Sequence, residues 1–385
     1  MQKVDTHSIA LDQVIRFGEY RYPFYVRHGS AAWPELLTHL DALQADHFVL
    51  VTDAAMPIAL REEAVRWLAQ LASCTVLTFG GGERAKTLSI VEALAQEALE
   101  AGVSRSSCIV ALGGGLVGNM AGLLAALLFR GIRLVHMPTT LLAMSDSVLS
   151  LKQAVNSPVG KNHLGTFYAP ELVWCDLAYL RWLPVREIQS ALCELIKNVV
   201  AITPEHYDEL HSLLDPAGVY SPEQHLHFIE LCIAAKCLVM QDDPLEKRDG
   251  LVLEYGHTVG HALEWLAARL LPQSGPLPHG FAVGLGMLVE ARISRLLGLL
   301  SAQDEQAQVE LLRCNGAPTT LPRAIAVGTV LVALERDNKR GYLPVQRGTY
   351  PMVLLEQLGR PHRHEGSILT PVPAQLVAAA LKALH

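Results

Sequence analysis

Paired cysteines and a surplus of basic residues are both missing from this chain of 385 residues. Its seven cysteines are scattered, with no CxxC pair and no repeated short spacing. We therefore expect reduced thiols, as in a cytoplasmic protein, rather than a disulfide framework. Acidic residues outnumber basic ones and give a net charge of -7, which argues against a nucleic-acid-binding surface.

Long apolar runs are missing too. The longest, at residues 121–129, falls well short of the roughly 20 residues that span a bilayer. The amino-terminal residues carry acidic side chains and no long apolar core, which is not the pattern of a signal peptide. These absences predict a soluble cytoplasmic protein with neither a membrane nor a nucleic acid as partner.

The residues that are present describe a well-packed protein. Half of them are hydrophobic and 18% are charged, a balance typical of folded domains with little disorder. At roughly 100 to 200 residues per domain, the length predicts two domains.

The most informative stretch runs from residue 108 to residue 162. A short apolar strand, CIVAL, breaks at Gly113, Gly114 and Gly115, and an Ala/Leu-rich helix follows. Adjacent glycines let the backbone approach a ligand, and a helix N-terminus offers unpaired N–H groups to phosphate oxygens. A plain strand-to-helix turn is the alternative. We expect the stretch to end in a polar loop, which carries Asp146, Lys152, Lys161 and Asn162.

Strand and helix patterns alternate through the amino-terminal half. Residues 1–28 read as strand material, a helix is expected from Ser30, and the strand HFVLVTD closes at Asp53. Thr87 opens a further helix. Such alternation predicts an α/β, Rossmann-like nucleotide-binding domain with a parallel sheet. Asp53 fits either a contact to the ribose or adenine of a nucleotide or a cap on the following helix.

After about residue 180 the pattern becomes helical. Segments such as VREIQSALCELIKNVVAI repeat their apolar residues at a spacing near 3.6. A hairpin-like piece, RGTYPMVLLEQLG, interrupts them late, and the chain closes in a helix. We predict an α/β domain over residues 1–180 and a mostly α-helical metal- and substrate-binding domain over residues 181–385.

Histidines and acids occupy these apolar helices. His257 and His261 stand four apart, and Glu254 and His257 three apart, so we expect each pair to share a helix face. His279 begins the next helix after a Pro/Gly-rich loop, and Glu194 lies within another. Imidazoles and a carboxylate from separate helices suit a divalent metal. A hydrogen-bonded core histidine, or a general base, is the alternative for any single residue.

Several motifs in fixed order identify a family. The segments GGGLVGNMAGLLAALLFRGI, PTTLLAMSDSVLSLKQAVN, GKN, CELIKN and EYGHTVGHA resemble the dehydroquinate synthase-like sugar phosphate cyclases. The resemblance runs from Asp53 to the RDNKRGY segment around Lys339. It implies an NAD-binding α/β domain, a helical metal domain and carbocycle-forming lyase chemistry.

The resemblance also implies roles for individual residues. It places a zinc or cobalt ion on Glu194, His257 and His279. It places NAD on Asp53, Glu83, Lys86, Gly114, Gly115, Asn119, Thr139, Thr140, Asp146 and Lys161. It places substrate on Arg130, Lys152, Asn162, Lys197, Lys236, Glu254 and Lys339. The implied catalytic residues are Asp146, Lys152, Lys197, Glu254 and His261. Arg130 matches an arginine that reaches the neighbouring subunit's phosphate, which implies a homodimer.

Two departures from the family pattern concern the substrate. Dehydroquinate synthases carry an arginine and, four residues later, an asparagine where this chain has Gly250 and Glu254. An acid in place of the bidentate arginine disfavours a carboxylate-bearing substrate. Glucose 6-phosphate fits better, and one branch of the family converts it into a deoxyinosose, the first carbocycle of the 2-deoxystreptamine antibiotics.

Three other interpretations of the protein's function remain open from the sequence. Within the family, a dehydroquinate synthase or a sedoheptulose 7-phosphate cyclase would share most of the motifs. A metal-dependent alcohol dehydrogenase would share the glycine turn and the helical metal domain. A scaffold subunit without activity is the third, although the retained Lys152, Glu194, Lys197, His257 and His279 argue against it.

Overall fold

The computed structural model describes residues 9–29, 32–80, 82–158, 160–271, 277–335, 339, 341–344 and 347–385. The chain divides into two compact units. The first comprises Met1–Leu183 and Tyr220–Glu230, and the second Pro184–Val219 and Leu231–His385. Ser30, where we expected the first helix to begin, lies outside the described residues.

A seven-stranded sheet forms the centre of the first unit, in the order β1-β2-β9-β6-β5-β3-β4. The strands are β1 (Leu11–Phe17), β2 (Tyr20–Arg27), β3 (His47–Asp53), β4 (Ser73–Phe79), β5 (Cys108–Gly113), β6 (Arg133–Pro138) and β9 (Leu172–Asp176). Only β1 and β2 pair antiparallel, and the other neighbours run parallel. The predicted α/β fold with a parallel sheet is confirmed.

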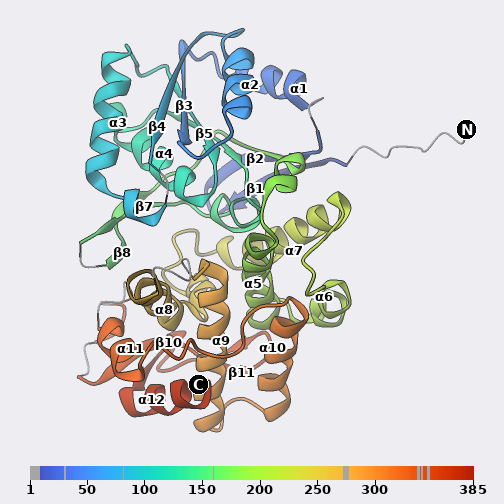
Figure 1. Ribbon diagram of the computed structural model, residues 1–385, viewed down its shortest axis with the longest axis vertical. Helices are drawn as coiled ribbons and strands as arrows, with labels where there is room; N and C mark the ends of the chain where they lie inside the picture. Colours follow the sequence, from blue (N-terminus) through green and yellow to red (C-terminus); the bar gives the residue numbers. More distant parts are fainter. Residues whose placement is uncertain are drawn as a thin grey trace, which may run out of the picture. The chain divides into compact units, whose positions relative to one another are not determined.

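Helices cover both faces of this sheet, which explains its continuously apolar strands. Successive residues of a strand face opposite sides. In β3, Phe48 and Leu50 therefore pack with α1 (Trp33–Asp41) and α2 (Ile58–Leu68). Val49 and Val51 pack with α3 (Leu88–Glu100) and α4 (Gly115–Leu127) on the other side (Figure 1).

The polar stretch after the glycine turn is not a loop, contrary to our expectation. It contains two strands that pair antiparallel, β7 (Lys152–Ser157) and β8 (Gly160–Phe167). Gln153 and Val155 are buried while their neighbours in β7 are partly exposed. This period of two supports a strand even where the residues are polar. The polar composition of the segment had led us to predict a loop instead.

Helices dominate the second unit. They are α5 (Val185–Ala201), α6 (Tyr207–Leu213), α8 (His257–Leu270), α9 (His279–Leu296), α10 (Ala302–Cys314), α11 (Val327–Leu334) and α12 (Ala374–Ala383), together with the end of α7 (Pro222–Met240). None of the described helices is long and apolar enough to cross a membrane.

The late strands do not form the expected hairpin. β10 (Thr349–Val353) pairs with β13 (Leu369–Pro373), and β11 (Leu355–Gln357) pairs with β12 (Arg360–Pro361). β10 and β11 are therefore neighbours in sequence but not partners in a sheet. Alternation of side chains predicts a strand but does not reveal its partner.

Helices α8 and α9 pack closely through glycines. A Cβ on Gly286 would lie 1.9 Å from the Gly256 carbonyl oxygen, and one on Gly260 would lie 3.0 Å from Val283 Cα. Gly256 itself has φ +78°, a left-handed conformation that favours glycine. The start of α8, which carries His257, is thus held against α9.

We predict that Gly286→Ala lowers the free energy of unfolding by about 1–3 kcal/mol, because the added methyl overlaps backbone. Gly328→Ala is the matched control, since its added Cβ would meet nothing within 4 Å. Replacing a helical glycine by alanine there should be neutral or stabilise by up to about 1 kcal/mol. Urea unfolding of both variants checks this, and equal midpoints would contradict it.

Candidate active site

The glycine turn lies at the carboxyl end of β5, where α4 begins. A Cβ on Gly115 would lie 2.6 Å from Ser147 Oγ, and one on Gly114 would lie 3.2 Å from Thr140 Cγ2. Thr139 N donates to Gly113 O at 2.9 Å. The neighbouring side chains therefore leave room only for glycine at this turn. Packing alone could explain the glycines, as in a plain strand-to-helix turn that binds no ligand. A role in binding a cofactor stays a prediction.

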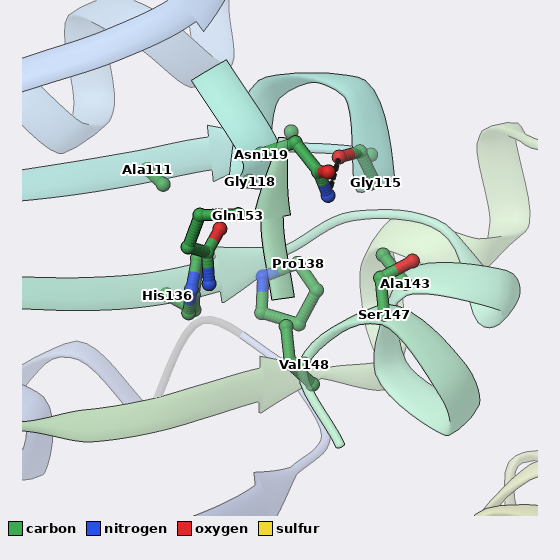
Figure 2. A pocket seen from close by; sticks show the side chains of 12 residues that line it. Ala111, Gly115, Gly118, Asn119, His136, Pro138, Ala143, Ser147, Val148 and Gln153 are labelled. Carbon is green, nitrogen blue, oxygen red and sulfur yellow. Dashed lines mark hydrogen bonds between the residues drawn. The ribbon is translucent and has the colours of Figure 1, made fainter. Parts of the chain in front are cut away.

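Asn119 links this turn to the β7–β8 hairpin. Its Nδ2 donates to Gly115 O at 3.1 Å (Figure 2). Its Oδ1 accepts from Ala154 N at 3.2 Å. An aspartate could accept from Ala154 but could not donate to Gly115. The side chain thus holds α4 beside the strand that begins at Lys152.

A pocket opens beside the turn (Figure 2). It is lined by Ala111, Gly113, Gly114, Gly115, Gly118, Asn119, His136, Pro138, Ala143, Ser147, Val148 and Gln153. Asp146 lies in the π-helical turn Ala143–Ser147 that borders it. Burial lowers the pKa of His136 to about 4, so its imidazole is neutral at pH 7. The sequence analysis singled out neither His136 nor Gln153.

A polar cluster joins the hairpin to the segment before α3. Lys86 Nζ donates to Asn162 Oδ1 at 2.6 Å, and Lys161 Nζ lies 3.3 Å from Glu83 Oε1. Asn156 connects the two pairs: Nδ2 donates to Glu83 Oε1 at 2.7 Å, and Oδ1 accepts from Asn162 N at 2.9 Å. The structure brings four predicted residues together. Asn156 connects them; it ends the family motif PTTLLAMSDSVLSLKQAVN, but we had predicted no role for it.

Two predicted residues of the first unit have other surroundings. Asp53 Oδ1 accepts from Ala55 N at 2.7 Å, in a turn that precedes α2. Arg130 is exposed and lies in a strained turn, because Phe129 and Arg130 have φ of 52° and 69°. Strain of this kind costs energy and is often found at functional sites.

The second unit brings Glu194, His257 and His279 together. Glu194 lies within α5, while His257 and His279 are the first residues of α8 and α9. Glu194 Oε1 lies 3.5 Å from His257 Nε2 and 3.3 Å from His279 Nε2. One ligand atom from each of the three residues lies within 4.8 Å of the others. These are the three residues on which the sequence placed a metal.

The electrostatics of this cluster fit a cation. His257 Nδ1 faces the Tyr255 carbonyl oxygen at 3.2 Å and must carry the ring proton to donate to it. The Nε2 lone pair then faces the Glu194 carboxylate, so two acceptors point at each other. The oxygens of the buried Glu194 face Lys197 Nζ and the Nε2 atoms of the two imidazoles. A tetrahedral site with bonds of about 2.1 Å has edges of about 3.4 Å, close to the observed separations.

The pKa values agree with this description. Burial lowers the pKa of His257 to about 4, which leaves its imidazole neutral. Burial opposes protonation of His279 as well, but hydrogen bonds to Glu194 and Glu264 outweigh it and raise the pKa to about 10. Burial alone would raise the pKa of Glu194, yet Lys197, His257 and His279 hold it well below its ordinary value. The protein thus keeps a carboxylate where a cation could bind.

Two further predicted residues, Lys197 and His261, lie beside the cluster. Lys197 Nζ lies 2.7 Å from Glu194 Oε2 and donates to Leu253 O at 2.8 Å. The His261 ring centroid lies 5.2 Å from that of His257 and 5.9 Å from that of His279. Lys236, on α7, is buried.

The structure corrects one expectation about Glu254. It does not share a helix face with His257, because it ends a 3-10 helix, Asp249–Glu254, and the left-handed Gly256 intervenes before α8. Its Oε2 instead pairs with the buried Lys339 Nζ at 3.1 Å. The Glu254 carboxylate and the Lys339 ammonium group thus form an ion pair that is largely buried.

Arg248 is the arginine nearest in sequence to Gly250, the position at which dehydroquinate synthases carry an arginine. Arg248 is exposed, and its Nη2 donates to Asp242 O at 2.6 Å. A Cβ on Gly250 would lie 3.0 Å from Asp243 Oδ2. The charged side chain nearest in sequence after Gly250 is that of Glu254.

An α/β unit with a glycine turn and a helical unit with a Glu-His-His cluster define a dehydroquinate synthase-like protein. Family models for the N-terminal and C-terminal parts of 3-dehydroquinate synthase match residues 76–190 and 191–340. The chain therefore belongs to the 3-dehydroquinate synthase family, and within it to the 2-deoxy-scyllo-inosose synthases, because its curated relatives carry that name.

The 2-deoxy-scyllo-inosose synthase of Streptoalloteichus tenebrarius is 46% identical over 371 residues, which cover 96% of this chain and 94% of that protein. The synthase of Micromonospora echinospora is 48% identical over 363 residues, covering 94% and 89%. A crystal structure of a 2-deoxy-scyllo-inosose synthase complexed with carbaglucose-6-phosphate, NAD+ and Co2+ superposes with a TM-score of 0.90 at 36% identity, covering 97% of this chain and 100% of that one. The resemblance stated from the sequence motifs is confirmed.

Glu264 provides a test of the cluster. Its Oε2 lies 3.0 Å from His279 Nδ1 and holds the ring with Nε2 toward Glu194. A carboxylate in this position orients a metal-binding imidazole and raises its basicity, so we predict that Glu264→Gln weakens Co2+ binding about 10-fold or more.

Glu356→Gln is the matched control, because Glu356 Oε1 contacts His362 Nδ1 at a similar 2.9 Å outside the cluster. Its Co2+ affinity should equal that of the wild type. Calorimetric titration of metal-free protein measures both variants. Equal losses of affinity in the two would refute a specific role for Glu264.

Proposed function

We propose that this protein converts D-glucose 6-phosphate into 2-deoxy-scyllo-inosose and phosphate, using NAD reversibly and one divalent metal ion. Membership of the 2-deoxy-scyllo-inosose synthases supports the proposal, as does the solved relative with carbaglucose-6-phosphate, NAD+ and Co2+. The observation in this chain that carries it is the pairing of Glu254 with Lys339 beside a Glu-His-His cluster.

That pairing discriminates between substrates. A carboxylate-bearing sugar phosphate would be repelled by Glu254, and Gly250 offers it no guanidinium where dehydroquinate synthases carry an arginine. Arg248 instead donates to the Asp242 carbonyl oxygen. The hydroxyls of glucose 6-phosphate can donate to Glu254, whose charge Lys339 balances. The second unit is therefore suited to a neutral polyol carrying a phosphate.

When bound, NAD would accept and return a hydride at C4, and a cation on Glu194, His257 and His279 would polarise the hydroxyl oxygens. Lys197 keeps Glu194 ionised and so preserves the carboxylate ligand. We assign Glu254 and His261 to proton transfer. Burial lowers the pKa of His261 well below its ordinary value, so its imidazole is neutral at pH 7 and has the free lone pair that a proton acceptor requires.

Residues of the first unit would hold the nucleotide and the phosphate. We assign the Gly114–Gly115 turn, Thr139, Thr140 and the Glu83, Lys86 and Lys161 side chains of the cluster around Asn156 to NAD. We assign Lys152 and Asn162 to the substrate, with Asp146 beside them as a proton-transfer group. Lysine charge would stabilise the phosphate as it leaves C6, after the C4 ketone acidifies C5–H.

Arg130 supports a further part of the proposal. Arg130 is exposed and lies in a left-handed turn that costs energy, and it matches an arginine that crosses between subunits in this family. These features are consistent with a homodimer in which each copy contributes Arg130 to its partner's phosphate. Zinc and cobalt both suit the ligand set.

The experiment that tests the function is phosphate release from glucose 6-phosphate, sedoheptulose 7-phosphate and the dehydroquinate synthase substrate, with NAD far below the substrate concentration. We expect multiple turnovers with glucose 6-phosphate alone and no accumulation of NADH. Turnover with another substrate would identify a different cyclase. Stoichiometric NADH formation from a polyol would identify an alcohol dehydrogenase.

Replacing Glu254 by Gln should lower kcat for glucose 6-phosphate by about 10²-fold or more, because a general base is lost. Co2+ affinity should be unchanged. Asp249→Asn is the control from the same 3-10 helix, since Asp249 pairs only with the exposed Arg363 among its described contacts. Initial rates of phosphate release measure both, and wild-type turnover by Glu254→Gln would exclude the catalytic role.

Replacing Asn156 by Ala should weaken NAD binding about 10-fold, because Glu83 and Asn162 each lose a hydrogen bond worth roughly 0.5–1.5 kcal/mol. Ser157→Ala removes a neighbouring bond to His163 and should leave NAD affinity unchanged. Fluorescence titration with NADH compares the two. An unaffected Asn156→Ala variant would place NAD elsewhere.

A further inference from the structure

Glu290 is a fully buried acid that the proposed reaction does not use. It lies on α9, three turns after His279, and is 0% exposed. Its Oε2 accepts a hydrogen bond from Gly256 N at 2.6 Å. A buried carboxylate costs several kcal/mol unless it is well paired, so the groups that it contacts bear on why an acid is kept there.

The peptide that Glu290 contacts also contacts a proposed metal ligand. Gly256 N belongs to the peptide group whose carbonyl oxygen is that of Tyr255, and this oxygen faces His257 Nδ1 at 3.2 Å. The helix ladder of α8 starts one residue later, with Gly260 N donating to Gly256 O at 2.9 Å. The Tyr255 carbonyl is therefore available to the imidazole.

We propose that Glu290 is a positioning residue that orients His257 through the Tyr255–Gly256 peptide. Its negative charge at the N–H end polarises the peptide, and the carbonyl at the other end becomes a stronger acceptor. The proton of His257 is then held on Nδ1, and the Nε2 lone pair is directed at the metal site. The inference rests on the metal centre of the proposed function.

This arrangement matches the one at His279, where Glu264 contacts Nδ1 directly at 3.0 Å. A carboxylate thus serves each imidazole, once directly and once through a peptide. Both contacts involve α9, which begins with His279 and carries Glu290. Gly286 packs closely against the Gly256 carbonyl, which belongs to the next peptide, and so limits the movement of Gly256.

Glu290→Gln tests the charge while keeping an acceptor of the same size. We expect the Co2+ dissociation constant to rise about 10-fold, as for other groups that orient metal ligands, and the visible absorption of bound Co2+ to change. The titration uses Co2+ alone, without sugar phosphate or NAD. It therefore stays informative if the substrate assignment fails.

Gln308→Leu is the matched control. Gln308 is buried nearby and its Oε1 accepts from the Tyr255 hydroxyl at 2.8 Å, so its loss affects the same region but not the peptide. We expect a lower Tm with unchanged Co2+ affinity. A Glu290→Gln protein with wild-type Co2+ affinity and spectrum would overturn the inference, whatever its Tm.

A second measurement uses the wild-type protein and decides the matter if Glu290→Gln does not fold. Tyr255–Gly256 is the one Tyr–Gly dipeptide in the sequence, so labelling tyrosine with carbonyl ¹³C and glycine with ¹⁵N isolates its NMR signal. We expect a downfield, slowly exchanging amide proton and a ¹³C shift when Zn²⁺ binds. Rapid exchange, or no response to Zn²⁺, would overturn the inference.

Discussion

The second unit depends on one unfavourable arrangement, in which the buried carboxylate of Glu194 faces the Nε2 atoms of two imidazoles. A proton on His279 relieves it in part, since the pKa of that group rises to about 10. A divalent cation would relieve it fully, because all three groups are ligands of such ions. Lys197 keeps the carboxylate ionised, and the acceptors behind the imidazoles fix their orientation.

The two units are organised around different kinds of contact. In the first, asparagine side chains join segments far apart in sequence: Asn119 links α4 to β7, and Asn156 links β7 to Glu83. Amides suit this task because each offers both a donor and an acceptor. In the second, ionisable side chains come together at the N-termini of α8 and α9, and glycines let these two helices pack closely. Neutral amides thus join the segments of the first unit, whereas ionisable side chains come together in the second.

Much of this could be predicted from the sequence, because the signals were local or ordered. The glycine turn follows from an apolar strand and a helix pattern, and the ligand residues follow from motifs shared with a family. Glu254 was misplaced because helical spacing assumes a continuous helix, which the left-handed Gly256 interrupts. Asn156, Glu264 and Glu290 escaped notice since their partners are set by tertiary packing, and an isolated polar residue carries no periodic signal.

The central claim is that Glu194, His257 and His279 together bind one divalent cation. X-ray absorption of the protein loaded with one equivalent of Co2+ tests it most directly. The account predicts two imidazole ligands and carboxylate oxygen at about 2.0–2.2 Å, and loss of tight binding in Glu194→Gln. A spectrum without imidazole scattering, or undiminished binding by Glu194→Gln, would contradict it.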